Sequence, residues 1–272
     1  MQERNTPPSA PARLDALGLR PLSARSVVAS VLLGTHPPRL SAAGLVELCG
    51  RFGISSGTTR VALSRMVAAG ELAAEEGHYR LVGEALLARQ RAQDAGLAPP
   101  TGPWDGRWRM AVVVSPGRTA GERVELRRAL ADGRFARWRE GVWLRPDNLG
   151  AAVALPAEAP VRWLVAEPDD DPPRLAGELW DLPGWSARGE GLLAAAPDEP
   201  GDLVAAPPEW AAATFATAAA TLRHLRTDPL LPEALLPPGW PADRLRARYA
   251  VYVEAIQELV RRLSGGPGPR SA

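Results

Sequence analysis

The stretch from Ser55 to Leu72 combines side chains that suit contact with a nucleic acid. It reads SSGTTRVALSRMVAAGEL, and its cations are Arg60 and Arg65. No acidic residue occurs in it before Glu71, although solvated helices usually mix charges of both signs. Arginine grips guanine edges or phosphates, hydroxyls suit phosphates or bases, and small residues let a helix lie deep in a major groove. The stretch therefore predicts a surface for duplex DNA.

A helix over this stretch would separate an apolar side from a basic side. At about 100° per residue, the side expected to pack inward carries Leu63, Met66, Val67 and Gly70, with Thr59 near its edge. The opposite arc is predicted to face DNA, because it gathers cations, hydroxyls and small side chains. Together with the expected helix cap, the candidate contacts are Ser55, Ser56, Thr58, Thr59, Arg60, Val61, Ser64 and Arg65.

The segments on either side predict a winged helix-turn-helix. Ser23 can cap a helix through about His36, and Ser41 can cap a second helix over AAGLVELCGRF. The residues GIS then form a tight turn before the third helix, which Ser55 or Ser56 caps. Helix, helix, turn, helix and hairpin follow one another in the order of that motif.

The expected hairpin consists of two short extended pieces around residues 72–74 and 79–82, with a turn near Glu76-Gly77. His78 and Arg80 are its candidate contacts to the adjacent DNA backbone. Glu75, together with its neighbour in the turn, argues against a deeply inserted wing, because carboxylates repel phosphates.

Length, charge and composition limit the number of domains and the class of protein that can be expected. The chain has 272 residues, enough for two or three domains, and its net charge of +1 means that any nucleic-acid surface has to be local. The N-terminal residues have no long apolar run, so neither a signal peptide nor a membrane anchor is expected, and we predict a cytoplasmic protein. Proline-rich segments suggest a flexible tail over 1–21, a winged-helix domain over 22–92, a central domain over 104–167 and a helical domain over 174–264.

The two later domains have different patterns, so that the whole chain is predicted to be α+β. Strand, helix, strand, strand and strand follow one another over 104–167, which is the order of a ferredoxin-like layer. Helices are expected over 209–226 and 243–263, the second capped by Asp243. An apolar stripe along that second helix fits either a dimer seam or packing on the first helix, and the pattern leaves both open.

No arrangement in the sequence predicts catalysis, a metal or a cofactor. The motifs GxSxG, Walker A and GxGxxG after a strand are all missing. The lone cysteine, Cys49, is expected in a helix core, and the two nearby histidines do not have metal-ligand spacing. The acidic run 169–171 stands between prolines and is interpreted as a solvated loop.

Three motifs in this order resemble the PaaX family of repressors of phenylacetic-acid catabolism. They are TRVALSRMVAAGEL with the hairpin after it, WDGRWRMAVV with LRRALADGRFARWREGVWLRPDN, and TDPLLPEALLPPGWP. The resemblance covers about residues 22–262. It implies a homodimeric transcriptional repressor that binds a partly palindromic operator and is released by an aryl-CoA thioester. The family's central domain is similar to small ferredoxin-like nucleases of CRISPR adaptation, but here Val114-Ser115-Pro116 stands where those carry an aspartate ligand.

The central segment offers a candidate effector site. Aromatic walls would hold an aryl group and arginines would hold CoA phosphates. The candidate residues are Arg107, Arg109, Trp138, Trp143 and Arg145. The alternative is an ordinary core edged by exposed arginines. For the whole protein, the alternatives to a repressor are a winged-helix protein–protein adaptor without DNA contacts and a nuclease or CoA-handling enzyme that uses the central domain.

Overall fold

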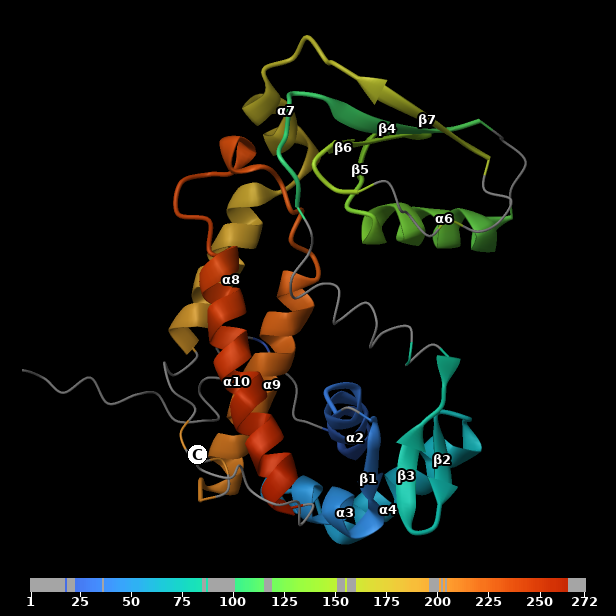
Figure 1. The fold of residues 1–272 in the computed structure, drawn as a ribbon, viewed down its shortest axis with the longest axis vertical. Coiled ribbons are helices and arrows are strands. Elements are labelled where there is room, and N and C mark those ends of the chain that lie inside the picture. Colours follow the sequence, from blue (N-terminus) through green and yellow to red (C-terminus); the bar gives the residue numbers. More distant parts are fainter. Residues whose placement is uncertain are drawn as a thin grey trace, which may run out of the picture. The chain divides into compact units, whose positions relative to one another are not determined.

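The computed structural model describes residues 18, 23–35, 37–84, 87, 101–114, 119–150, 155, 160–195, 201, 203 and 205–263. They form an α+β fold, as predicted, in two compact units (Figure 1). One unit comprises Met1–Leu97, Gly189–Arg226 and Pro241–Ala272, and the other comprises Ala98–Arg188 and Thr227–Trp240. Residues of the helical domain that the sequence suggested over 174–264 thus belong to both units.

The first elements that the structure describes in this unit are three helices and a small antiparallel sheet (Figure 1). The elements are α2 (Ala24–Leu33), β1 (Arg39–Ser41), α3 (Ala42–Arg51), α4 (Ser56–Ala68), β2 (Leu72–Glu75) and β3 (His78–Leu81). The strand order is β1-β3-β2. This is the predicted winged helix-turn-helix with one further strand, β1, which at three residues is too short to show an alternating pattern in the sequence.

Serine side chains start all three helices, as predicted. Ser23 accepts a hydrogen bond from the Ser26 amide, Ser41 from the Gly44 amide, and Ser55 from the Thr58 amide. Each cap satisfies an amide that the first helical turn leaves without an internal partner. The first helix ends at Leu33, before the expected end near residue 36, which lies outside the described residues.

Two long helices and part of a third are the other described helices of the first unit. They are α8 (Leu182–Ala195), of which the residues from 189 belong to this unit, α9 (Pro208–Leu225) and α10 (Ala242–Leu263). Helices α9 and α10 lie side by side (Figure 1) and share one hydrophobic core with the winged helix. Phe215 of α9 contacts Phe52, which follows α3, with ring centroids 4.9 Å apart. Leu259 of α10 is buried in the same core.

The stripe of α10 packs inside the chain rather than forming an exposed seam. Leu245, Tyr249 and Tyr252 are buried, and α9 is the neighbouring helix. Of the two alternatives that the pattern left open, packing on the preceding helix is the one observed. Asp243 does not cap this helix, because α10 already begins at Ala242 and the aspartate stands in its first turn.

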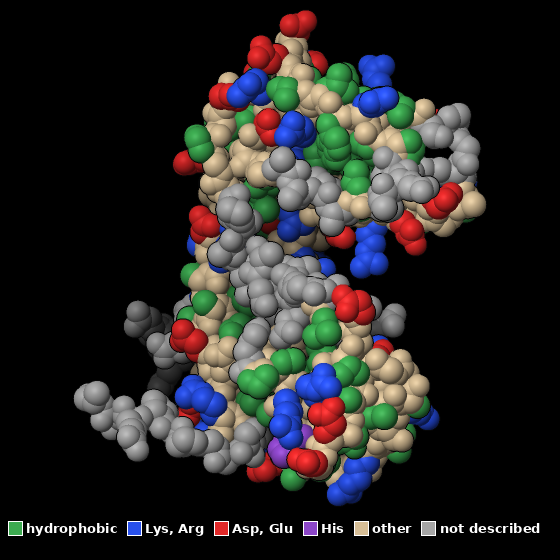
Figure 2. All heavy atoms as spheres, turned by 45° about the vertical axis from the view of Figure 1, so that its right-hand side comes forward, with side chains coloured by type: hydrophobic (Ala, Val, Ile, Leu, Met, Phe, Trp, Pro, Cys, Tyr) green, Lys and Arg blue, Asp and Glu red, His purple; other side chains and the backbone are tan. Residues whose placement is uncertain are grey.

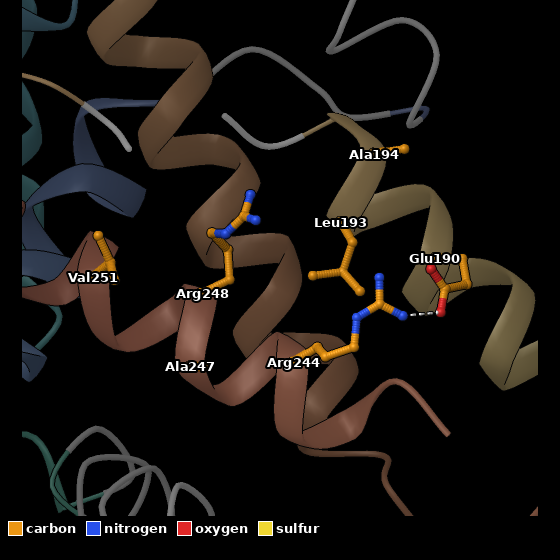
Figure 3. Close-up of a pocket in the computed structure, with 7 residues that line it drawn as sticks. All are labelled: Glu190, Leu193, Ala194, Arg244, Ala247, Arg248 and Val251. Atoms are coloured by element: carbon orange, nitrogen blue, oxygen red, sulfur yellow. Dashed lines mark hydrogen bonds and ion pairs between the residues drawn. The ribbon is translucent and has the colours of Figure 1, made fainter. Parts of the chain in front are cut away.

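An open groove of about 510 Å³ runs between α8 and α10 (Figure 3). Its lining residues are Glu190, Leu193, Ala194, Arg244, Ala247, Arg248 and Val251. Nη1 of Arg244 donates a hydrogen bond of 2.7 Å to Oε1 of Glu190, and Figure 3 shows this pair bridging the two helices. The groove thus has an apolar floor and a rim on which charges of both signs already meet.

The second unit is built on a four-stranded antiparallel sheet (Figure 1). Its elements are β4 (Trp108–Val113), α6 (Ala120–Asp132), β5 (Ala136–Arg139), β6 (Val142–Pro146), β7 (Val161–Ala166), α7 (Pro172–Leu179) and η1 (Glu233–Leu235). In the order β5-β6-β4-β7, β4 and β5 both run antiparallel to β6 and are therefore parallel to each other. Helix α6 connects these two parallel strands across β6, which is the split βαβ arrangement of the predicted ferredoxin-like layer.

Each face of this sheet has its own core. Leu126 and Leu130 of α6 pack with Trp143 on one face, whereas Leu175 of α7 packs with Trp108 on the other. Helix α7 begins where the sequence suggested a solvated acidic loop, because the Asp171 side chain accepts a hydrogen bond from the amide of residue 174. In the part of the chain that the structure describes, no helix has the length and apolar character needed to cross a membrane.

Candidate nucleic-acid interface

Helix α4 is held by a short buried stripe. Leu63 and Met66 are each 1 % exposed and belong to the core that α2 and α3 also enter. Thr59 is fully buried, and its Oγ1 donates a 3.1 Å hydrogen bond to the carbonyl of Ser55. Contacts at steps of three and four fix the rotation of the helix, so that its remaining face turns away from the core.

The outward face of α4 carries the predicted side chains. The exposed candidates are Ser55, Ser56, Thr58, Arg60, Val61, Ser64 and Arg65. Among the described residues, no carboxylate pairs with Arg60 or Arg65. Val61, between these two cations, is 51 % exposed. The helix therefore presents two unneutralised guanidinium groups, hydroxyls and one apolar side chain, which are the groups used to contact phosphates and base edges.

One contact candidate of α4 and two positions of the helical projection differ from the structure. Thr59 was a candidate contact, but its burial and its bond to Ser55 make it part of the helix's inner side. Val67 and Gly70 were expected inside, yet Val67 is 36 % exposed and Gly70 is exposed as well. The projection treated the helix as continuous through Gly70, whereas α4 ends at Ala68, so its last turn has less of the core beside it.

The start of α4 suits a phosphate group. Oγ of Ser55 accepts from the amide of Thr58 at 3.2 Å and lies 2.8 Å from the Thr58 hydroxyl. The first turn contains no acidic residue, and Ser56 and Gly57 are exposed. Free amides and the positive end of the helix dipole attract anions, so this end adds to the attraction of the two arginines.

The carboxylate that follows α4 is held away from this face. Both carboxylate oxygens of Glu71 accept hydrogen bonds from Arg25 of α2, one of them from Nε at 3.1 Å. The side chain of Glu71 is only 20 % exposed. This bidentate pair ties the start of β2 to α2 and keeps the face of α4 free of negative charge.

The wing is a tight hairpin, as predicted. Glu76 and Gly77 have φ values of 47° and 76°, which two-residue turns of type I′ require. Of the two wing candidates, Arg80 donates from Nη2 to Oε1 of Glu75 at 2.8 Å. The ring Nδ1 of His78 is 3.1 Å from the carbonyl oxygen of Glu76. Figure 2 shows charged side chains of both signs on the face that it displays. The wing is thus electrostatically mixed, in contrast to α4.

The five effector candidates of the second unit lie in different surroundings. Arg107 pairs with Asp105, its Nε donating at 2.7 Å, and Arg109 approaches Asp147 with 3.6 Å between nitrogen and oxygen. Trp138 is 36 % exposed, and the Arg139 guanidinium lies over its ring. These three side chains are at the surface or half-buried, and both arginines have a carboxylate neighbour.

The other two candidates are buried. Trp143 is 9 % exposed in the core beneath α6. Arg145 is 3 % exposed, donates from Nη2 to the carbonyls of Leu149 and Gly150, and lies over the ring of Phe135 at 4.9 Å. Burial lowers the pKa of its guanidinium below the ordinary value, an effect that the charge of Asp147 opposes. In this arrangement both side chains support the sheet rather than line an open aromatic pocket.

Catalytic and metal chemistry finds little support in the described residues. Within them, no group of three or more His, Cys, Asp and Glu side chains could hold a metal ion. Cys49 is buried, and burial raises the pKa of its thiol, which keeps it in the weakly nucleophilic protonated form. β4 ends at Val113, and the residues from 115 to 118, where the sequence lacks the nuclease aspartate, lie outside the described part.

Comparisons with known proteins agree with this arrangement. The family described as PaaX-like protein matches residues 23–85, and the family described as PaaX protein central Cas2-like domain matches residues 101–159. A solved structure, the uncharacterized protein Rv0674 from Mycobacterium tuberculosis, is 45 % identical with a TM-score of 0.72. The similarity covers 89 % of this chain and 98 % of that one. No curated protein sequence matched the chain.

Proposed function

Since the chain belongs to the PaaX family of DNA-binding transcriptional regulators, we propose that it is a ligand-responsive repressor that reads its operator with α4. The observation that carries the proposal is the exposed, acid-free face of α4, with Arg60 and Arg65 unpaired among the described residues. In a helix-turn-helix the second helix enters the major groove and its N-terminal residues contact base edges.

We expect the residues of α4 to make different kinds of contact, according to their position on the helix. Arg60, Val61 and Ser64 follow one another along the middle of the exposed arc and are the candidates for contacts to bases. Ser55 and Ser56 stand at the helix start, where phosphates bind most readily. Base contacts give sequence preference, while phosphate contacts give affinity and position.

The repressor acts as a homodimer in this proposal, with a second copy paired at β7. This strand lies at the edge of the sheet, next to β4 alone among the described strands. Its successive side chains Trp163, Leu164 and Val165 are 40 %, 47 % and 46 % exposed. An exposed apolar edge strand is a template for pairing with another chain. Antiparallel pairing about a two-fold axis at Leu164 would place Trp163 of one copy opposite Val165 of the other.

A dimer matches the demands of operator binding. A single winged helix makes few base contacts, whereas two copies double them and fix the distance between half-sites to about one helical turn or a multiple of it. Release from DNA then requires a ligand that binds one arrangement of the two heads more tightly than the other. We propose an aryl-CoA-like effector, in line with the resemblance to phenylacetate-pathway repressors.

The test is a comparison of Arg60→Ala and Arg65→Ala by fluorescence anisotropy, with DNA from upstream of the chain's own gene and from neighbouring genes. Losing a bidentate base contact should weaken specific binding by about 1–3 kcal/mol. Losing a phosphate contact should weaken binding to all sequences alike and lower the salt slope by about one unit. Arg128→Ala on α6, an exposed arginine of the second unit, is the matched control. Wild-type affinity in both α4 variants would instead show that α4 does not read the operator, and a wild-type chain that binds none of these duplexes would support the adaptor without DNA contacts.

A further inference from the structure

The outward face of the wing sheet carries two arginines around a single carboxylate. Pairing across the strands sets Arg39 opposite Arg80, and it sets His78 between Ser41 and Glu75. Because side chains alternate along a strand, these five side chains share one face of the sheet. The other face turns to the core, with Leu40, Leu72 and Leu81 all buried.

Glu75 is bound to this cationic surface through Arg80. Nη2 of Arg80 donates to Oε1 of Glu75 at 2.8 Å, and the two side chains are 43 % and 51 % exposed. The pKa of the Glu75 carboxyl is held below its ordinary value by the hydrogen bond and charge of Arg80, with a smaller contribution from the charge of Arg39. The carboxylate therefore sits where an anion approaching these arginines from solvent would bind.

We propose that Glu75 is a specificity-determining residue that occupies the position of a DNA phosphate on the wing. This inference rests on the proposed DNA binding. A phosphate that approaches Arg80 has to compete with Glu75 for its guanidinium, so the wing adds little to the affinity for duplex of arbitrary sequence. When α4 is bound to its operator site, the wing lies beside the adjacent DNA backbone. The replacement of Glu75 by a DNA phosphate at Arg80 is then an intramolecular step. Since sequence-independent affinity comes almost entirely from phosphate contacts, Glu75 lowers it selectively.

The experiment measures binding of the full-length chain to a short duplex of arbitrary sequence over a range of salt concentrations. Glu75→Gln should bind this duplex about two- to fivefold more tightly than wild type, the range expected from releasing one exposed ion pair. The slope of the logarithm of its affinity against the logarithm of salt concentration should become steeper by about one unit, which corresponds to one additional phosphate contact. Glu76→Gln, one residue further along the hairpin, removes the same charge without releasing Arg80 and is the matched control.

The same substitutions in a chain without the Arg80 side chain distinguish the effect of releasing Arg80 from the effect of removing one negative charge. In chains that carry Arg80→Ala, the change Glu75→Gln should have no more effect than Glu76→Gln. Equal tightening by the two glutamine variants in the presence of Arg80 would overturn the inference and leave the proposed function standing. If the wild-type chain binds no duplex even at low salt, the proposed function fails, and this inference with it.

Discussion

The close packing around Gly189 of α8 leads to a prediction about stability that can be measured. A Cβ added at Gly189 would lie 2.8 Å from Cγ of Pro241, 3.1 Å from Cδ1 of Leu245 and 3.4 Å from Nε2 of His224. The proline ring cannot rotate away, so the helices must move apart. A Cβ at Gly191, on the same helix, would have no neighbour within 4 Å.

These distances predict that replacing glycine by alanine lowers stability at Gly189 and raises it at Gly191. Overpacking costs about 1–3 kcal/mol, and replacing glycine by alanine in a helix returns about 0.8–1 kcal/mol. Gly189→Ala should therefore destabilise the protein by up to about 2 kcal/mol. Gly191→Ala should stabilise it by about 0.5–1 kcal/mol, since only the helix preference changes.

Thermal unfolding followed by circular dichroism measures the difference. For a chain of this size, about 1 kcal/mol corresponds to about 2–4 °C in Tm. The two variants should lie on opposite sides of wild type in the transition of the unit that contains α10. If Gly189→Ala were as stable as Gly191→Ala, the close approach of α8 to Pro241 and Leu245 would be wrong.

Three further substitutions test separate parts of the structure. Thr59→Val should lower stability by about 1 kcal/mol through loss of the hydrogen bond to Ser55, yet leave DNA affinity unchanged; a selective loss of DNA binding would return Thr59 to the interface. Gly77→Ala should destabilise the wing hairpin by about 1 kcal/mol, because alanine resists a positive φ, and urea unfolding would show it; unaltered stability would contradict the type I′ turn. Leu164→Asp should convert a dimer to a monomer in analytical ultracentrifugation, and a persistent dimer would place the interface elsewhere than β7.

The parts of the winged helix that depend on local signals could be predicted from the sequence. Ser23, Ser41 and Ser55 begin their helices where their side chains can accept an amide hydrogen bond, and Glu76-Gly77 forms the turn between two strands. In each case the determining interaction lies within a few residues of chain. The exposed arc with Arg60 and Arg65 followed from helical periodicity alone.

Tertiary contacts account for most of what the sequence left undetermined. The position of the buried Arg145 over the ring of Phe135 depends on the pairing of β5 with β6. The ion pair of Arg80 with Glu75 depends on the register between β2 and β3, and a shift of one residue would put these side chains on opposite faces. The common core of α10 and the winged helix joins segments far apart in the chain, for which single-sequence patterns carry no signal.

The central claim, that the outward face of α4 lies on duplex DNA, has a direct test in photo-crosslinking. Cys49 is buried and is the chain's single cysteine, so a benzophenone maleimide will react selectively with an introduced exposed thiol. The labelled Ser64→Cys variant, on α4, should crosslink to duplex DNA on irradiation. The labelled Glu125→Cys variant, on an exposed position of α6, should not. Crosslinking from α6 but not from α4, in variants that both bind the duplex, would contradict the account.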